Sequence, residues 1–313
     1  MMRRHFYLLW LVLALAGCQT STERDAIVGT DGDAFKHELS AAAAGDMKAQ
    51  AAIGIRYEEG VGVAADEDKA AYWMRKAAAQ GDAAIQTRLG LLLSNKEPKE
   101  STQWSRKAAE QGHAPAQVNL GIHYMGGVGV EHDDSQAVFW FRKAAELGDA
   151  AGQNNLALML RSGRGVPQNC PEALAWLQKA VAPDQASQAR QFSDAAMAQL
   201  GNMYRDGECV DRDERRAVEW FRSATALDGM DGVYGLAKAY ATGHGVEQDV
   251  VVAVALFKTI EGQTIVDRDN SLYELSFAIG WDASLRADAL AREMREEGRL
   301  EALARYMAGK AQE

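Results

Sequence analysis

The feature that most constrains this chain is a segment that recurs in its sequence. The stretch YEEGVGVAADEDKAAYWMRKAAAQGD, Tyr57–Asp82, returns as YMGGVGVEHDDSQAVFWFRKAAELGD at Tyr124–Asp149. More diverged copies start at Leu160, Tyr204 and Tyr240. A catalytic motif is usually needed once, so regular repetition predicts an architecture in which each copy is one stacking unit.

Alignment of the copies on one small residue defines six units. Successive anchors are 36, 31, 36, 44 and 36 residues apart: Gly54, Gly90, Gly121, Ala157, Gly201 and Ala237. In four units a tryptophan stands 19 residues after the anchor: Trp73, Trp140, Trp176 and Trp220. The spacing predicts two antiparallel helices per unit, in which the small anchor allows close approach and the aromatic ring fills the gap beside it.

Glycine and aspartate mark where these helices should end and begin. The dipeptides Gly45-Asp46, Gly81-Asp82 and Gly148-Asp149 suit a left-handed helix end followed by a capping carboxylate. Within a unit the connection is Gly-x-Gly-Val, followed by an acid such as Asp66, Asp133 or Asp249. Glycine-rich loops can bind phosphate, but five copies and no preceding strand favour a turn.

The combined pattern resembles Sel1-like repeats, which are related to tetratricopeptide repeats. It runs over residues 35–262 and includes Leu-Gly, Tyr, Gly-x-Gly-Val, Trp and Lys-Ala-Ala at fixed places. The resemblance implies an all-α fold, an α/α superhelical solenoid of about six helix-turn-helix repeats. Unit two departs, with SNKEPKES in place of its turn, and unit four is followed by the insertion APDQASQARQFS.

Both flanks of the repeats have their own character. Residues 35–46 align with the second helix of a unit and predict a capping half-repeat, while the polar residues 18–34 suit a flexible tether. Residues 263–313 form a non-repeat helical cap in this interpretation, because helical spacing continues there at Leu272, Leu275, Ile279, Leu300, Leu303 and Met307.

Residues 1–17 have the organisation of a bacterial export signal. Arg3 and Arg4 precede an apolar run that is shorter than the roughly 20 residues of a membrane span. Leu15-Ala16-Gly17-Cys18 resembles a lipobox, which implies cleavage before Cys18 and its acylation. Gln19 then favours an outer-membrane lipoprotein that faces the periplasm. The alternative is an ordinary leader that contains a cysteine.

Two cysteines remain once Cys18 carries lipid. Cys170 and Cys209 lie in equivalent interhelical loops of neighbouring repeats, and an oxidising compartment permits a bridge. They nevertheless stand five positions apart in the repeat register. Both a disulfide and two free thiols therefore stay open.

The sequence contains few motifs that indicate catalysis or metal binding. The six histidines show no metal-ligand spacing, and neither Gly-x-Ser-x-Gly nor Ser-x-x-Lys occurs, so we expect no catalytic residue, no metal and no cofactor. With 34 basic against 44 acidic residues and no basic patch in the repeats, nucleic acid is an improbable partner.

A surface for another protein is what remains. Side chains near the anchors on each first helix should turn away from the core and line the concave side: Arg56, Arg88, Asn119, His123, Asn155 and Gln199. The leading hypothesis is a non-enzymatic, lipid-anchored scaffold that holds a protein or peptide partner in an envelope, secretion or polysaccharide-export complex. The alternatives are a cell-wall glycopeptide or β-lactam binder or hydrolase, and a regulator of a periplasmic enzyme.

Overall fold

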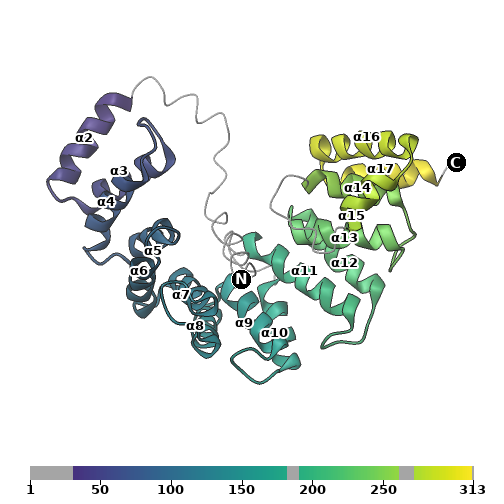
Figure 1. The fold of residues 1–313 in the computed structure, drawn as a ribbon, viewed down its shortest axis with the longest axis horizontal. Coiled ribbons are helices and arrows are strands. Elements are labelled where there is room, and N and C mark those ends of the chain that lie inside the picture. The colour runs from purple at the N-terminus through teal and green to yellow at the C-terminus, as the bar shows by residue number, and fades with distance from the viewer. Residues whose placement is uncertain (1–30, 182–189, 261–270, 312–313) are drawn as a thin grey trace. The chain divides into compact units, whose positions relative to one another are not determined.

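A computed structural model describes residues 31–181, 190–260 and 271–311 of the chain. Those ranges form sixteen helices and contain no strand (Figure 1), which confirms the all-α prediction. The chain divides into two compact units, residues 1–168 and 169–313.

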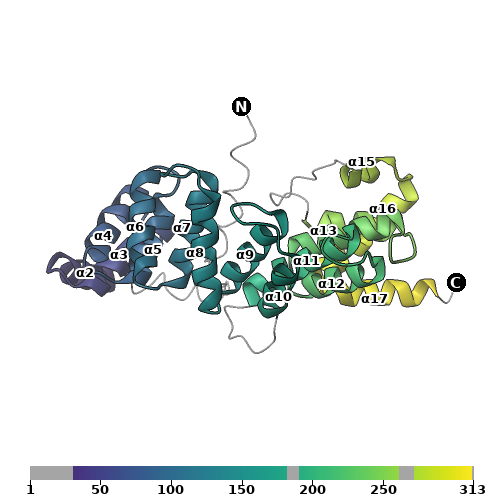
Figure 2. The same cartoon turned by 90° about the horizontal axis from the view of Figure 1, so that it is seen from below.

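The first unit holds a capping helix and the first repeats. Its helices are α2 (Asp31–Ala43), α3 (Met47–Glu59), α4 (Glu67–Ala78), α5 (Ala83–Leu93), α6 (Pro98–Glu110), α7 (Ala114–Gly126), α8 (Asp134–Glu146) and α9 (Ala150–Ser162). Helices α3 to α8 stand side by side as successive hairpins (Figure 2). Helix α5 also contacts α7, and α7 contacts α9, so the first helices of these repeats lie next to one another. This is the arrangement expected on the inner side of a curved array.

The predicted helix ends and helix starts are present in the backbone. Gly60, Gly127 and Gly163 end first helices in the left-handed conformation. The carboxylates of Asp46, Asp82 and Asp149 accept hydrogen bonds from the first turns of α3, α5 and α9. Unit two lacks the glycine turn, and only residues 94–97 separate α5 from α6, with Pro98 as the first helical residue.

The packing partner of the anchor differs from the prediction. A Cβ on Gly121 would lie 2.5 Å from Cε1 of Phe141, and a Cβ on Gly201 would lie 2.5 Å from Cε1 of Phe221. The residue that fills the gap is thus the one after the tryptophan. One step along a helix turns a side chain by about 100°, and Trp73, Trp176 and Trp220 are half-buried, whereas Trp140 is buried.

A row of glutamines ties each repeat of the first unit to the element before it. The Nε2 atoms donate to carbonyl oxygens near the end of the preceding helix: Gln50 to Ala42 at 3.0 Å, Gln86 to Ala78 at 3.1 Å, Gln117 to Ala109 at 3.2 Å and Gln153 to Ala145 at 3.4 Å. In the first two repeats a second glutamine completes the bond network: Gln80 donates to Oε1 of Gln50, and Gln111 donates to Oε1 of Gln86. We call this row the glutamine ladder.

The second unit contains the remaining repeat helices and a cap. Its helices are α10 (Cys170–Ala180), α11 (Arg190–Asp206), α12 (Glu214–Ala226), α13 (Met230–Thr242), α14 (Val250–Ile260), α15 (Ser271–Ala278), α16 (Trp281–Glu297) and α17 (Arg299–Lys310). A disulfide joins Cys170 to Cys209, with their Cα atoms 5.0 Å apart.

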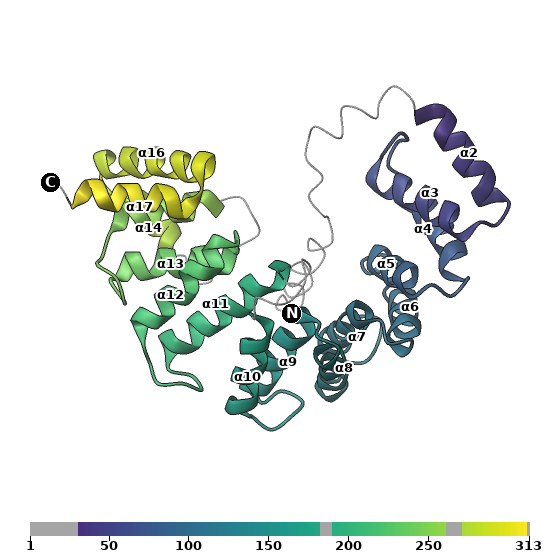
Figure 3. The same ribbon diagram turned by 180° about the vertical axis from the view of Figure 1, so that it is seen from behind.

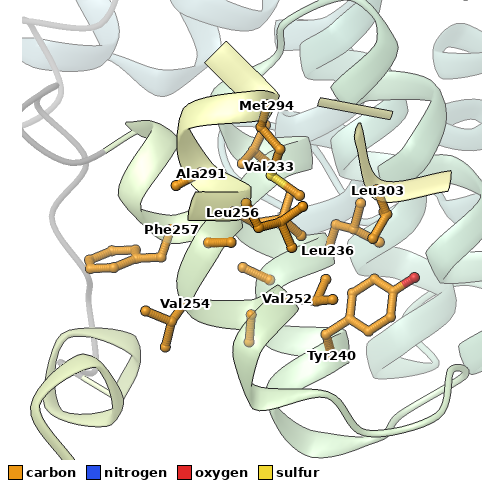
Figure 4. Packing of buried hydrophobic residues seen from close by; sticks show 14 of the residues in the cluster. Val233, Leu236, Tyr240, Val252, Val254, Leu256, Phe257, Ala291, Met294 and Leu303 are labelled. Atoms are coloured by element: carbon orange, nitrogen blue, oxygen red, sulfur yellow. The ribbon is translucent and has the colours of Figure 1, made fainter. Parts of the chain in front are cut away.

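Three helices follow the last repeat in the described part of the chain, and they pack on its apolar side. Helix α16 packs on α14 and α17 packs on α16 (Figure 3). Helix α14 is buried on nearly all sides, and Leu256, Met294 and Leu303 meet in one core that joins repeat and cap (Figure 4). Lys310 of α17 pairs with Asp249 at the start of α14 at 2.9 Å, which closes the array at this end.

The predicted capping half-repeat is present as α2, which packs on α3 and begins at Asp31, four residues before the expected boundary. The predictions for residues 1–17 and Cys18, and most of the predicted tether, lie outside the described residues. None of the helices in the described ranges is both long and apolar enough to cross a membrane.

Candidate interaction surface

Two arginines predicted to face a ligand instead join repeats. The Nε atom of Arg56 donates to Glu38 of α2 at 2.8 Å, and its side chain is only 17% exposed. Arg88 on α5 pairs with Glu58 at 2.9 Å and with Glu59 at 2.7 Å, both on α3. Arg56 therefore holds the cap in place, and Arg88, 37% exposed, bridges two first helices while still reaching solvent.

Asn119 and His123 are not on the surface, so the prediction for these two is wrong. They are 9% and 5% exposed. His123 Nδ1 lies 2.8 Å from Oγ1 of Thr102, and this hydroxyl also donates to the carbonyl of Val128. Burial lowers the pKa of His123 to about 4, which keeps the imidazole neutral. His123 falls inside because α7 packs on α6 of the preceding repeat, which carries Thr102.

The last two predicted residues are half-buried. Asn155 lies on α9 in the first unit and Gln199 on α11 in the second. Of the six predicted residues, Arg56, Arg88 and Asn155 remain partly accessible within the first unit. The first-helix face thus offers a smaller polar surface than the sequence suggested.

The second helices carry a feature that the sequence reading missed. Tyr72 and Phe139 are 51% and 47% exposed and hold the same position in repeats one and three. The Nζ atom of Lys76 lies 4.6 Å from the Tyr72 ring centre, and that of Lys143 lies 4.8 Å from the Phe139 ring centre. We call these four residues the aromatic-lysine face. Its signal was present, since each ring immediately precedes a repeat tryptophan and stands four residues before a lysine.

This face has the composition of a protein-binding surface. Each ring packs edge-on against the tryptophan that follows it, at 5.2 Å for Tyr72 and 5.0 Å for Phe139 between ring centres. The lysine also lies over that tryptophan. Rings held in this way lose little freedom on binding, and aromatic residues are enriched in interfaces.

The described ranges hold no cluster of three His, Cys, Asp or Glu side chains able to ligate a metal. A shallow pocket of about 780 Å³ in the second unit includes Tyr204, Asp213 and Arg216 in its lining. Its groups serve local structure, since Asp213 caps α12 and the Arg216 guanidinium stacks 4.9 Å from the Tyr204 ring centre.

Comparison with known proteins identifies the class. The Sel1 repeat model matches residues 48–82, 86–113, 114–149, 150–182, 194–229 and 231–259. The chain belongs to the Sel1 repeat family, as its sequence pattern suggested. No curated protein matches it.

The fold is similar to that of a solved structure from this family. A Sel1 repeat protein from Oxalobacter formigenes is 27% identical, with a TM-score of 0.61 over 82% of this chain and 69% of that one. A protective antigen of uropathogenic Escherichia coli with an SLR fold is 26% identical over 88% of this chain and 74% of that one, at a TM-score of 0.33. A putative Sel1 repeat protein from Klebsiella pneumoniae is 22% identical over 65% and 98%, at 0.41.

Proposed function

We propose that this chain is a lipid-anchored scaffold on the periplasmic side of the outer membrane, where its first repeats hold a protein partner. Sel1 repeats generally mediate protein–protein interaction. The observation that carries the proposal is the aromatic-lysine face, because it presents the same ring and cation twice, in repeats one and three. Repeated display on a rigid array suits a protein surface better than a small molecule.

Two further features support the location. Leu15-Ala16-Gly17-Cys18 supplies the lipid attachment signal, with Cys18 as the acylated residue. The disulfide between Cys170 and Cys209 fits an oxidising compartment, since such bonds are rare where thiols are kept reduced. Radiolabelled palmitate on the wild-type chain and none on Cys18→Ser is the expected result. Equal labelling of the wild-type chain and Cys18→Ser would contradict acylation at Cys18.

Partner capture from the native membrane tests the scaffold. We expect a crosslinked partner with the wild-type chain and at least tenfold less with Tyr72→Ser/Phe139→Ser. The matched control is Leu285→Ser, which removes an apolar side chain that is 51% exposed on α16 of the second unit. Loss with Arg88→Ala/Asn155→Ala instead would move the binding surface to the first helices.

An enzymatic role is tested separately. Purified protein is incubated with muropeptides and a chromogenic cephalosporin, and we expect no hydrolysis above buffer. Turnover that disappears on changing a single acidic residue would overturn the scaffold proposal.

A further inference from the structure

The turns of repeats three, four and six rest on the previous repeat at a distance that excludes side chains. A Cβ on Gly129 would lie 2.0 Å from the carbonyl oxygen of Pro98, the first residue of α6. Gly165 stands in the same relation to the first residue of α8, at 2.3 Å, and Gly245 to that of α12, at 2.2 Å. The second turn glycine therefore packs directly on the start of the preceding second helix.

Cysteines occupy both sides of this contact between repeats four and five. Cys209 holds the turn position, in the left-handed conformation with φ of 68°. Cys170 is the first residue of α10 and is bonded to it. The two cysteines stand five positions apart in the repeat register. The turn glycine and the first residue of the preceding second helix, such as Gly165 and Asp134, stand apart by the same five positions. At this junction the disulfide takes the place of the close backbone contact that a turn glycine makes at the junctions described above.

The same junction lacks the other connections of the first unit. The residue at the glutamine-ladder position is Met197, and the Gly-Asp dipeptide between repeats is absent. Ser193 Oγ donates to the carbonyl of Ala180 at 3.0 Å instead. The disulfide, this hydrogen bond and the packing of the two helices hold α10 in register with α11.

We propose that the Cys170–Cys209 bond is a redox-dependent lock on the junction between repeats four and five. When oxidised, it holds the start of α10 against the next turn. When reduced, this junction opens before any other part of the array. The side chain of Cys209 is the reason, because a Cβ prevents the close contact that glycine makes elsewhere. The reduced junction then has neither the bond nor the contact.

The chemistry of the lock is thiol–disulfide exchange. The two thiols lose two protons and two electrons as the S–S bond forms, and a protein disulfide of the thioredoxin-like class is reduced to its dithiol. Both cysteines are half-buried, so a partner thiolate can reach them once the turn moves. The assembled array is therefore favoured in an oxidising compartment.

Hydrogen exchange of the full chain, with and without dithiothreitol, tests the lock. We expect reduction to accelerate exchange in α10 and in residues 193–200 by at least tenfold, within the range that loss of a disulfide produces. Exchange in α5 to α8 should stay unchanged. No acceleration in α10, or the same acceleration in both units, would overturn the proposal.

Two variants separate the lock from general damage. Cys170→Ala/Cys209→Gly restores the repeat pattern, so we expect no response to dithiothreitol and slower exchange in α10 than in the reduced wild type. Cys170→Ala alone keeps the side chain at position 209 and should exchange as fast as the reduced wild type. Equal exchange in the two variants would show that the glycine contact has no part in the junction.

Discussion

The two units build their repeat junctions with different bonds. In the first unit the same hydrogen bond from a glutamine recurs at every junction from α2 to α9, and ion pairs such as Arg88–Glu58 cross between repeats. In the second unit a disulfide replaces the ladder at one junction, and Val233 stands at the ladder position of the next. Repetition of one polar bond is thus a property of half the array only.

The ends and the charge of the units differ as well. Residues 31–168 carry 15 basic and 18 acidic side chains, whereas residues 169–313 carry 16 and 24. In the second unit, ion pairs such as Lys310–Asp249 tie the cap to the repeats. The comparison teaches that apolar packing recurs in both units, while the polar connections between repeats differ from one unit to the other.

The largest expected effect concerns the turn contact that the units share. Gly165→Ala adds a Cβ that meets the Asp134 backbone at a φ of +67°, so we expect a loss of about 4 kcal/mol in the free energy of unfolding. Gly245→Ala in the second unit should cost as much. Urea titration followed by circular dichroism measures both.

The control for this prediction is Gly148→Ala. Gly148 also has a positive φ, of +84°, but nothing lies within 4 Å of its Cβ position. We expect a cost of about 1 kcal/mol, from the backbone conformation alone. A cost equal to that of Gly165→Ala would mean that the turn contact contributes nothing.

Acid should weaken the first unit. The pKa of His123 is lowered by burial to about 4 in the folded chain, from a usual value of 6.5. The unfolded chain takes up the proton first, so stability is full above pH 6.5 and falls as the pH drops towards 4, by up to about 3 kcal/mol. His123→Gln should remove this dependence. Urea unfolding at pH 4 to 7 measures it, and an unchanged profile in the variant would contradict it.

The second unit should show the opposite trend. Burial, followed by the charge of Asp231, raises the pKa of Asp194 to about 6, from a usual value of 3.8. Stability from this group is present below pH 3.8 and is lost as the pH rises through 6, by up to about 2 kcal/mol. Asp194→Asn should therefore be more stable than the wild type at pH 7. His123→Gln and Asp194→Asn are controls for each other, because they change opposite sides of the profile of stability against pH.

The smallest expected effect is a gain. Oε1 of Gln117 is buried without a hydrogen-bond partner, and Leu147 stands where Gln80 and Gln111 complete the ladder in the first two repeats. Leu147→Gln should donate to that oxygen and stabilise the chain by about 1 kcal/mol.

Leu227→Gln is the matched control for this gain. Leu227 is the corresponding residue of repeat five, where the ladder position holds Met197 and offers no acceptor. We expect no gain from it. Thermal unfolding compares both variants with the wild type, and equal gains would assign the effect to surface polarity.

Much of the fold could be predicted because its signals are local. Six repeats, the capping carboxylates of Asp66 and Asp133, and the helical spacing of Leu300 and Leu303 all depend on residues close in the chain. The candidate surface could not be predicted in the same way. Periodicity places Asn119 and His123 on a face of α7, but only the distance to the neighbouring helices decides that this face is buried.

The sequence by itself determined where helices begin and end and how often the hairpin recurs, since capping and turn conformation depend on a few adjacent residues. Tertiary structure decided which side chain fills the anchor gap, which arginines became ion pairs, and that Cys170 meets Cys209. These outcomes depend on how one repeat is rotated and displaced against the next. That geometry arises from the packing of whole helices, and no single stretch of residues specifies it.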